Sequence, residues 1–163
     1  MKSIRIAVPV LFLLTAASTF AQSQKPLDLM KTLSGIWAGK TSDGHEAKEV
    51  YRLASNGSVV MSEMPGHDNM ISMFHQDGDR IMLTHYCSMG NQPRMVGTLS
   101  PDGKTINFEF LDATNLSSPQ AGHIHRAVIT IVDANHLTED WYFQQGDKEH
   151  HEHFDLERQK SAV

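Results

Sequence analysis

The chain has 163 residues, with 14 basic and 19 acidic side chains and a formal net charge of −5. This length fits one domain with one hydrophobic core, and an acidic balance without basic runs argues against nucleic acid or an anionic membrane as a partner. Cys87 is the only cysteine, so an internal disulfide is excluded and stability must come from the core.

The first 21 residues have the pattern of a secretory signal peptide. Lys2 and Arg5 form the positive start, and the apolar run Ile6–Leu14 is too short to cross a bilayer. Thr19 and Ala21 supply small residues at the two positions that a signal peptidase reads, so we predict cleavage before Gln22. The residue after this cleavage site is not a cysteine, so we expect no lipid anchor. Removing Lys2 and Arg5 from the 14 basic residues leaves 12 against 19 acidic ones, a net charge of −7. We therefore expect a periplasmic or secreted protein without membrane attachment.

Residues 22–163 predict a single all-β domain. Pro26–Leu33 can form a short helix, because Pro26 suits the first helical position and Gly35 follows the end. Beyond it, short runs rich in β-branched, aromatic and methionine residues alternate with turn residues at steps of about ten, which is typical of antiparallel barrels and sandwiches. We predict ten strands: Ile36–Thr41, Glu46–Ala54, Ser58–Met64, Met70–His75, Arg80–Cys87, Arg94–Leu99, Thr105–Phe110, His123–Val132, His136–Gln144 and Lys148–Glu157.

The connections between these strands are alternately tight and loose. Tight turns such as Ser55-Asn56-Gly57 and Pro101-Asp102-Gly103 follow strands two, four, six and eight, and looser loops follow the odd-numbered strands. In an up-and-down antiparallel barrel successive strands run in opposite directions, so all tight turns lie at one end and all looser loops at the other. The N-terminal helix would plug the tight end, and the loops would surround an open mouth.

This arrangement gathers most of the histidines at the mouth. Eight of the ten belong to mouth loops or to the mouth halves of strands: His45, His67, His85, His123, His125, His150, His151 and His153. Only His75 and His136 fall at the tight end.

Side chains alternate between the two faces of a strand, which predicts the contents of the interior. An apolar floor is expected from residues such as Phe108 and Trp141, whereas His151 and His153 should point outward. Above the floor, the inward positions are Glu49, Tyr51, His85, Cys87, His123, His125, His150 and Glu152. Buried titratable groups need partners or water, so these residues predict a polar, partly wet cavity. The alternative to a cavity is that the histidines at the rim are solvated and the buried histidines hydrogen-bond to each other.

Two functions follow from such a cavity. The first is non-enzymatic binding of a small, partly apolar ligand by Tyr51, His85, Asn91, Arg94, Phe108 and Trp141. Asn91 and Arg94 belong to the loop Met89–Arg94, although Arg94 equally suits a surface ion pair. We expect a monomer or a weak homodimer.

The second function is metal binding. His123 and His125 form a His-x-His pair, which presents two imidazoles on one strand face, and His85, His150 or Glu152 could complete the ligand set. Such ligands suit zinc, copper or nickel, and haem on a single inward histidine is a narrower variant. A bound metal with an open position would permit metal-dependent catalysis.

Nucleophilic catalysis has weaker support in the sequence. Cys87 and Ser88 are near histidines, and Glu49 and Glu152 supply acids, but no G-x-S-x-G turn is present to activate a serine. The sequence therefore favours a binding protein over an enzyme.

Two sets of residues resemble known families. Gly35-Ile36-Trp37, after a short helix, resembles the G-x-W signature of lipocalins and related calycin barrels, in which an arginine from the last strand, here Arg158, packs on the tryptophan. The stretch Leu83–Met95, with Asp112–Leu116 and His123-Ile124-His125, resembles a family of exported bacterial lipocalin-like proteins. A barrel of ten strands resembles the fatty-acid-binding and nitrobindin-type barrels more than the eight-stranded lipocalins. These resemblances imply a barrel fold and export, and no particular chemistry.

Overall fold

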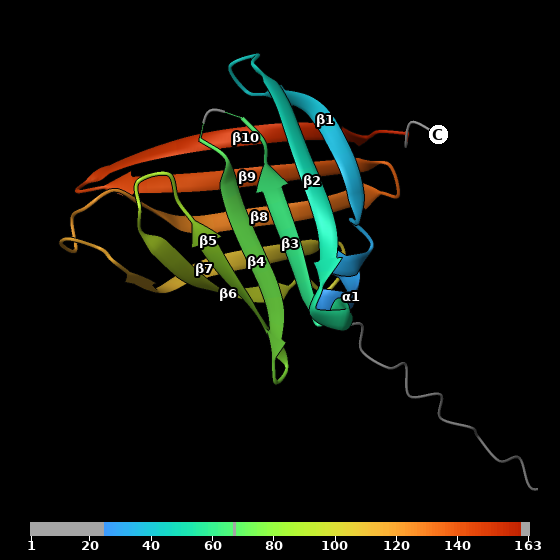
Figure 1. Cartoon of the computed structure of the whole chain (residues 1–163), viewed down its shortest axis with the longest axis horizontal. Helices are drawn as coiled ribbons and strands as arrows, with labels where there is room; N and C mark the ends of the chain where they lie inside the picture. Colours follow the sequence, from blue (N-terminus) through green and yellow to red (C-terminus); the bar gives the residue numbers. More distant parts are fainter. Residues whose placement is uncertain (1–24, 67, 161–163) are drawn as a thin grey trace, which may run out of the picture.

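The computed structural model describes residues 25–66 and 68–160. The predicted signal peptide lies outside these residues. One short helix and ten strands make up the fold (Figure 1): α1 (Pro26–Lys31), β1 (Gly35–Thr41), β2 (Glu46–Ala54), β3 (Val59–Met64), β4 (Met70–Asp77), β5 (Arg80–Tyr86), β6 (Gln92–Leu99), β7 (Thr105–Thr114), β8 (His123–Asp133), β9 (His136–Gln145) and β10 (Lys148–Arg158).

The strands form one closed antiparallel barrel. Each strand pairs with its neighbours in the chain, and β1 closes the barrel by pairing with β10, as in Gly39 opposite Leu156. This arrangement confirms the predicted up-and-down barrel with a short N-terminal helix. Because the sheet closes on itself, every strand has a neighbour on both sides.

The two ends of the barrel differ as the turn chemistry predicts. At the tight end, β2 and β3 are joined by a 3₁₀ turn over Ser55–Gly57, in which Asn56 has φ 55°, and β4 and β5 are joined through Gly78 with φ 60°. These left-handed conformations are tolerated best by Asn and Gly. The longest connection, between β7 and β8, lies at the other end, which we call the mouth.

Helix α1 covers the tight end of the barrel (Figure 1). It packs against β3, β4, β5 and β6, and it buries Leu27, Leu29 and Met30. Trp37 on β1 is fully buried beside it and donates from Nε1 to the Leu33 carbonyl over 2.7 Å. The residues that the sequence marks as a plug therefore fill one end of the lumen.

Arg158 at the end of β10 holds this plug in place. Its guanidinium carbon lies 4.3 Å from the centre of the Trp37 ring. Its three nitrogens donate to the carbonyls of Thr32, Ser34 and Ala134, each over 2.8 Å. The contact expected from the G-x-W resemblance is confirmed.

The apolar core fills the barrel from α1 to its middle. Phe74 and Phe108 pack with ring centres 5.6 Å apart, and both are fully buried. A side chain on Gly97 would overlap Ile81 and Phe108, so the absence of a Cβ lets these two fill the floor. The polar residues lie beyond this floor, toward the mouth. Within the described ranges, no helix has the length and apolar character needed to cross a membrane.

Candidate ligand-binding site in the mouth half of the barrel

A row of polar side chains crosses four neighbouring strands just above the core. Backbone pairing sets Tyr51 opposite Ser62, and Ser72 opposite His85, on β2 to β5. Paired residues on adjacent strands share a face, and all four side chains are buried. Because Tyr51 also packs against Phe74 of the core, with ring centres 6.5 Å apart, the row faces inward.

Two buried carboxyl groups meet beside this row. Glu49 on β2 and Glu139 on β9 are almost fully buried and lie close together, and Oε2 of Glu49 has no hydrogen-bond partner in the described part of the chain. Burial and the nearby Glu139 charge raise the pKa of Glu49 well above its ordinary value. The raised pKa favours the protonated form of Glu49, in which its hydroxyl can donate to Glu139.

Glu139 collects further donors. The hydroxyl of Tyr51 donates to Oε1, and Trp141 Nε1 donates to Oε2 over 2.7 Å. Glu49 accepts from the hydroxyl of Ser62 through Oε1. Burial, together with the two carboxyl groups, raises the pKa of Tyr51 well above its ordinary value, so its hydroxyl remains a donor. The group is a hydrogen-bonded network rather than a pair of isolated buried charges.

His85 lies at the other end of the polar row, and one of its two ring nitrogens, Nε2, has no hydrogen-bond partner among the described residues. Its Nδ1 lies 3.0 Å from Ser72 Oγ, and its ring centre is 5.3 Å from that of Trp141. Nε2 is buried and has no protein partner. Burial lowers the pKa of His85 to about 4, so the ring is neutral at physiological pH. Leaving a buried polar nitrogen unpaired is costly, so a partner from outside the chain is expected.

A cavity of about 60 Å³ lies against these groups. A water needs roughly 10–15 Å³ on this measure, so the space holds several waters or the end of a small molecule. Its polar lining comes from the network and its apolar lining from the mouth-side core. The lining residues are Glu49, Ser62, Met64, Met70, Ser72, His85, Ile124, Trp141, Glu152 and Phe154.

Two grooves at the mouth adjoin the cavity. One, of about 320 Å³, shares Ile124, Trp141 and Glu152 with it, and the other, of about 260 Å³, shares Met64, Met70, Glu152 and Phe154. Glu152 lines all three spaces and therefore lies at their junction. Burial and the nearby charge of Asp43 raise the pKa of Glu152. A ligand could thus place one end in the cavity and its body in a groove.

The six predicted ligand residues are only partly brought together. His85 and Trp141 line the cavity, and Tyr51 supports it through Glu139. The other three predicted residues have different roles. Asn91 is buried and donates to the Gly122 carbonyl over 2.8 Å, Phe108 belongs to the core floor, and Arg94 forms a two-pronged ion pair with Asp112. The ion pair is the second of the two roles that the sequence allowed for Arg94.

The five predicted metal ligands do not converge. His85 and Glu152 line the cavity, His150 lines a mouth groove, and His123 and His125 lie elsewhere. Across residues 25–66 and 68–160, no three His, Cys, Asp or Glu side chains are grouped so that they could hold a metal ion.

A bulge in β8 explains the positions of His123 and His125. Ile124 pairs with Phe143 and Arg126 pairs with Tyr142, so His125 is an extra residue without a partner. One extra residue reverses the alternation beyond it, and Ile124 lines the cavity instead of the two histidines. The prediction that both histidines face the lumen, which assumed unbroken alternation, is therefore wrong.

Both histidines have partners of their own. Nδ1 of His123 lies 2.8 Å from the Ala121 carbonyl, and its ring packs on Phe110 with centres 4.8 Å apart. Nε2 of His125 lies 2.7 Å from a carboxylate oxygen of Glu149.

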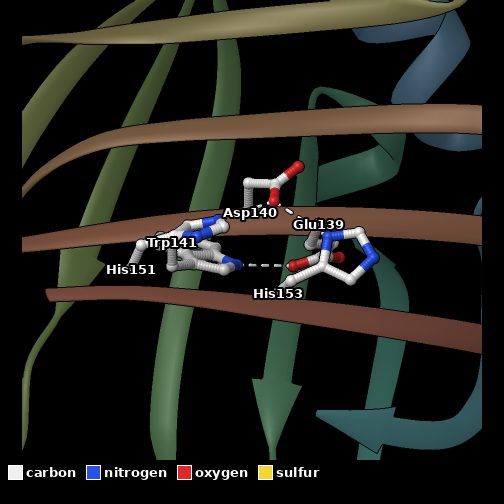
Figure 2. Close-up of polar contacts among 5 residues, drawn as sticks. All are labelled: Glu139, Asp140, Trp141, His151 and His153. Carbon is white, nitrogen blue, oxygen red and sulfur yellow. Dashed lines mark hydrogen bonds and ion pairs between the residues drawn. The ribbon is translucent and has the colours of Figure 1, made fainter. Parts of the chain in front are cut away.

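His151 and His153 lie on the outer face of the barrel, as predicted. Figure 2 shows them on β10 beside Asp140 of β9, whose Oδ1 lies 2.7 Å from His151 Nε2 and 2.8 Å from His153 Nδ1. Burial raises the pKa of Asp140, but the hydrogen bonds from the two imidazoles outweigh it and the net pKa is lowered. Glu139 and Trp141, the neighbours of Asp140 in the strand, belong to the inner network. Adjacent residues of β9 thus serve opposite faces.

Three residues of the inner network were not assigned to the site from the sequence. Ser62 and Ser72 occupy inward positions of β3 and β4, and Glu139 shares the inward face of β9 with Leu137 and Trp141. Their signal is a polar residue at a position where period-two alternation requires an apolar one. Applied to every strand, that rule finds all three.

No family model matches the chain, and no curated protein matches it. Among solved structures, it is similar to Rv2717c from M. tuberculosis, with a TM-score of 0.58 and 19% sequence identity over 82% of this chain and 97% of that one. At this identity the likeness shows the fold alone. The fold and cavity therefore define a closed ten-stranded antiparallel barrel with a polar pocket beneath its mouth.

Proposed function

We propose that this protein is a small-molecule-binding barrel whose ligand enters through the mouth and places one polar end against His85. The observation that carries the proposal is the buried, unpartnered Nε2 of His85 in the lining of a cavity. A neutral imidazole in this position pairs with one polar atom of a ligand and discriminates against molecules that lack it. The apolar lining, including Trp141 and Phe154, suits a partly apolar body.

Binding rather than catalysis is the function that these groups support best. Tyr51 and Trp141 are occupied with Glu139, and Ser62 is occupied with Glu49, so the network holds the pocket in shape. The signal-like first 21 residues support the same function outside the cytoplasm, in the periplasm or the medium.

Trp141 provides a direct test, because its indole lines the cavity whereas Trp37 is buried in the plug. Protein isolated from its own host compartment should carry a small molecule in native mass spectrometry, and that molecule should change the emission of Trp141 on rebinding. Trp141→Phe should abolish the emission change.

A matched pair of variants on β8 separates pocket binding from surface binding. Ile124→Phe narrows the passage between cavity and groove and should weaken rebinding by at least about tenfold. Val132→Phe adds a similar ring at an exposed position near the far end of the strand and should leave rebinding unchanged. Equal binding by both variants, or a host-derived protein without any bound molecule, would contradict the proposal.

A further inference from the structure

The charged residues that line the cavity itself are acidic. Of the described residues that line the cavity, Glu49 and Glu152 are acidic and none is a lysine or an arginine. The adjoining grooves add three acidic residues and one lysine, together with three histidines: Asp43, Glu46, Asp68, Lys48, His45, His150 and His151. A ligand in this space experiences a negative electrostatic potential between low-dielectric walls, and this potential favours a positively charged group.

Burial raises the pKa of both cavity acids, and a second acid adds to the effect in each case. Glu49 lies close to Glu139, and Glu152 lies close to Asp43. Tyr51, which acts on Glu49, and His85, which lines the same cavity, are neutral at physiological pH and supply no positive charge. His45 partly compensates the charge of Glu152, whereas among the described residues that line the cavity itself there is no lysine or arginine to compensate Glu49.

The unpartnered nitrogen of His85 fits the same ligand. In the tautomer in which Nδ1 donates to Ser72, Nε2 carries a lone pair and accepts a hydrogen bond. An ammonium group has three donors, and the cavity offers the acceptors His85 Nε2, Glu49 and Glu152. The aromatic rings of Trp141 and Phe154, which also line the cavity, suit a cation and its apolar body.

We propose that the ligand of this cavity is a small protonated amine with an apolar body, whose ammonium group donates to the unpartnered Oε2 of Glu49 and Nε2 of His85. This inference rests on the proposed binding function and names its ligand class. Where Glu49 is protonated, binding sends that proton to the buffer and the carboxylate pairs with the ammonium group. Because burial raises the pKa of Glu49, amine binding should release protons, up to about one for each alkylamine that enters already protonated.

Isothermal titration calorimetry in two buffers of different ionisation enthalpy measures this proton release. The probes are straight-chain amines of three to six carbons and 2-phenylethylamine, each compared with its matched alcohol and carboxylate. We expect the best amine to bind at least about tenfold more tightly than its alcohol, with release of up to about one proton. The matched alcohol should bind without proton exchange.

Glu49→Gln tests the role of the carboxyl group. The amide keeps the size and hydrogen bonding of the protonated acid but cannot ionise. It should weaken amine binding by at least about tenfold, abolish proton release and leave alcohol binding within about twofold. Glu157→Gln removes the same charge near the tight end, where Glu157 pairs with Ala38, and should change neither measurement.

The possible outcomes separate this inference from the proposed function. Alcohols that bind as tightly as amines, or amines that bind without proton release, overturn the amine assignment and leave a binding barrel. If the carboxylate probes bind tightly and the protein takes up a proton, the ligand is instead an anion that pairs with protonated His85. If no probe binds and the host-derived protein carries no molecule, both proposals fail.

Discussion

Single residues fix how closely the strands of this barrel approach one another. Gly39 lies on β1 opposite Leu156 of β10, at the seam that closes the barrel. A Cβ on Gly39 would overlap the backbone carbonyl of Asp155, and a backbone atom cannot turn aside as a flexible side chain can. Gly66, in the β3–β4 connection, has open space around its Cβ position.

We therefore expect Gly39→Ala to destabilise the protein by about 3 kcal/mol or more, because the seam must part to admit one methyl group. Gly66→Ala should change the free energy of unfolding by less than about 0.5 kcal/mol. Urea denaturation followed by far-ultraviolet circular dichroism measures both variants. Similar stabilities of the two variants would show that closure does not depend on this glycine.

At the scale of elements, α1 has little stability of its own. It has six residues and no side-chain cap at its N-terminus, and isolated helices of this length are unstable in water. It is held by its buried apolar residues and by Arg158, which joins the end of β10 to the carbonyls of Thr32 and Ser34. The plug therefore depends on a residue more than 120 positions away in sequence.

Arg158→Lys should destabilise the protein by about 2 kcal/mol. Lysine keeps the charge but cannot bind three carbonyls and stack on Trp37 at the same time. Arg52→Lys is the matched control, because Arg52 forms an exposed ion pair with Glu63 that should be worth less than about 1 kcal/mol. Hydrogen exchange of the α1 amides should increase in the Arg158 variant. Unchanged exchange and stability would show that packing alone holds the plug.

At the scale of the whole molecule, two of the cavity groups with shifted pKa values, His85 and Glu49, make stability depend on pH in opposite directions. The pKa of His85 falls from 6.5 in the unfolded chain to about 4 when folded, so its contribution is complete above pH 6.5 and is lost as the pH falls toward 4. The pKa of Glu49 is raised, so its contribution is complete below about pH 4.5 and is lost as the pH rises through the folded pKa.

Two variants should reveal these contributions separately. As the pH falls from 6.5 to 4, the unmodified protein should lose up to about 3 kcal/mol more of its free energy of unfolding than His85→Phe does. Glu49→Gln should gain stability relative to the unmodified protein as the pH rises above 4.5, since no buried group must then ionise. Urea denaturation at pH 4, 5.5, 7 and 8.5 tests both. Parallel pH profiles for all three proteins would show that neither group is buried as described.

Local patterns determined most of the fold. Turn residues such as Asn56 and Gly78 mark the tight end because their conformations are local properties, and strand alternation correctly placed Glu49, His85 and Trp141 in the interior. Counting strands was enough to predict which end carries the mouth, because antiparallel neighbours reverse direction. The export, the oligomeric state and the ligand stay predictions.

Tertiary structure alone decided how the polar residues combine. The bulge at His125 depends on how β8 fits β9 and the barrel, and no local pattern in the sequence predicts it. The contact between Glu49 and Glu139 joins residues 90 positions apart in sequence, across a lumen that exists only once β10 has met β1. Periodicity could specify which face each side chain takes, because that is a property of one strand. It could not specify which side chains meet, because such contacts depend on the curvature and closure of the whole barrel.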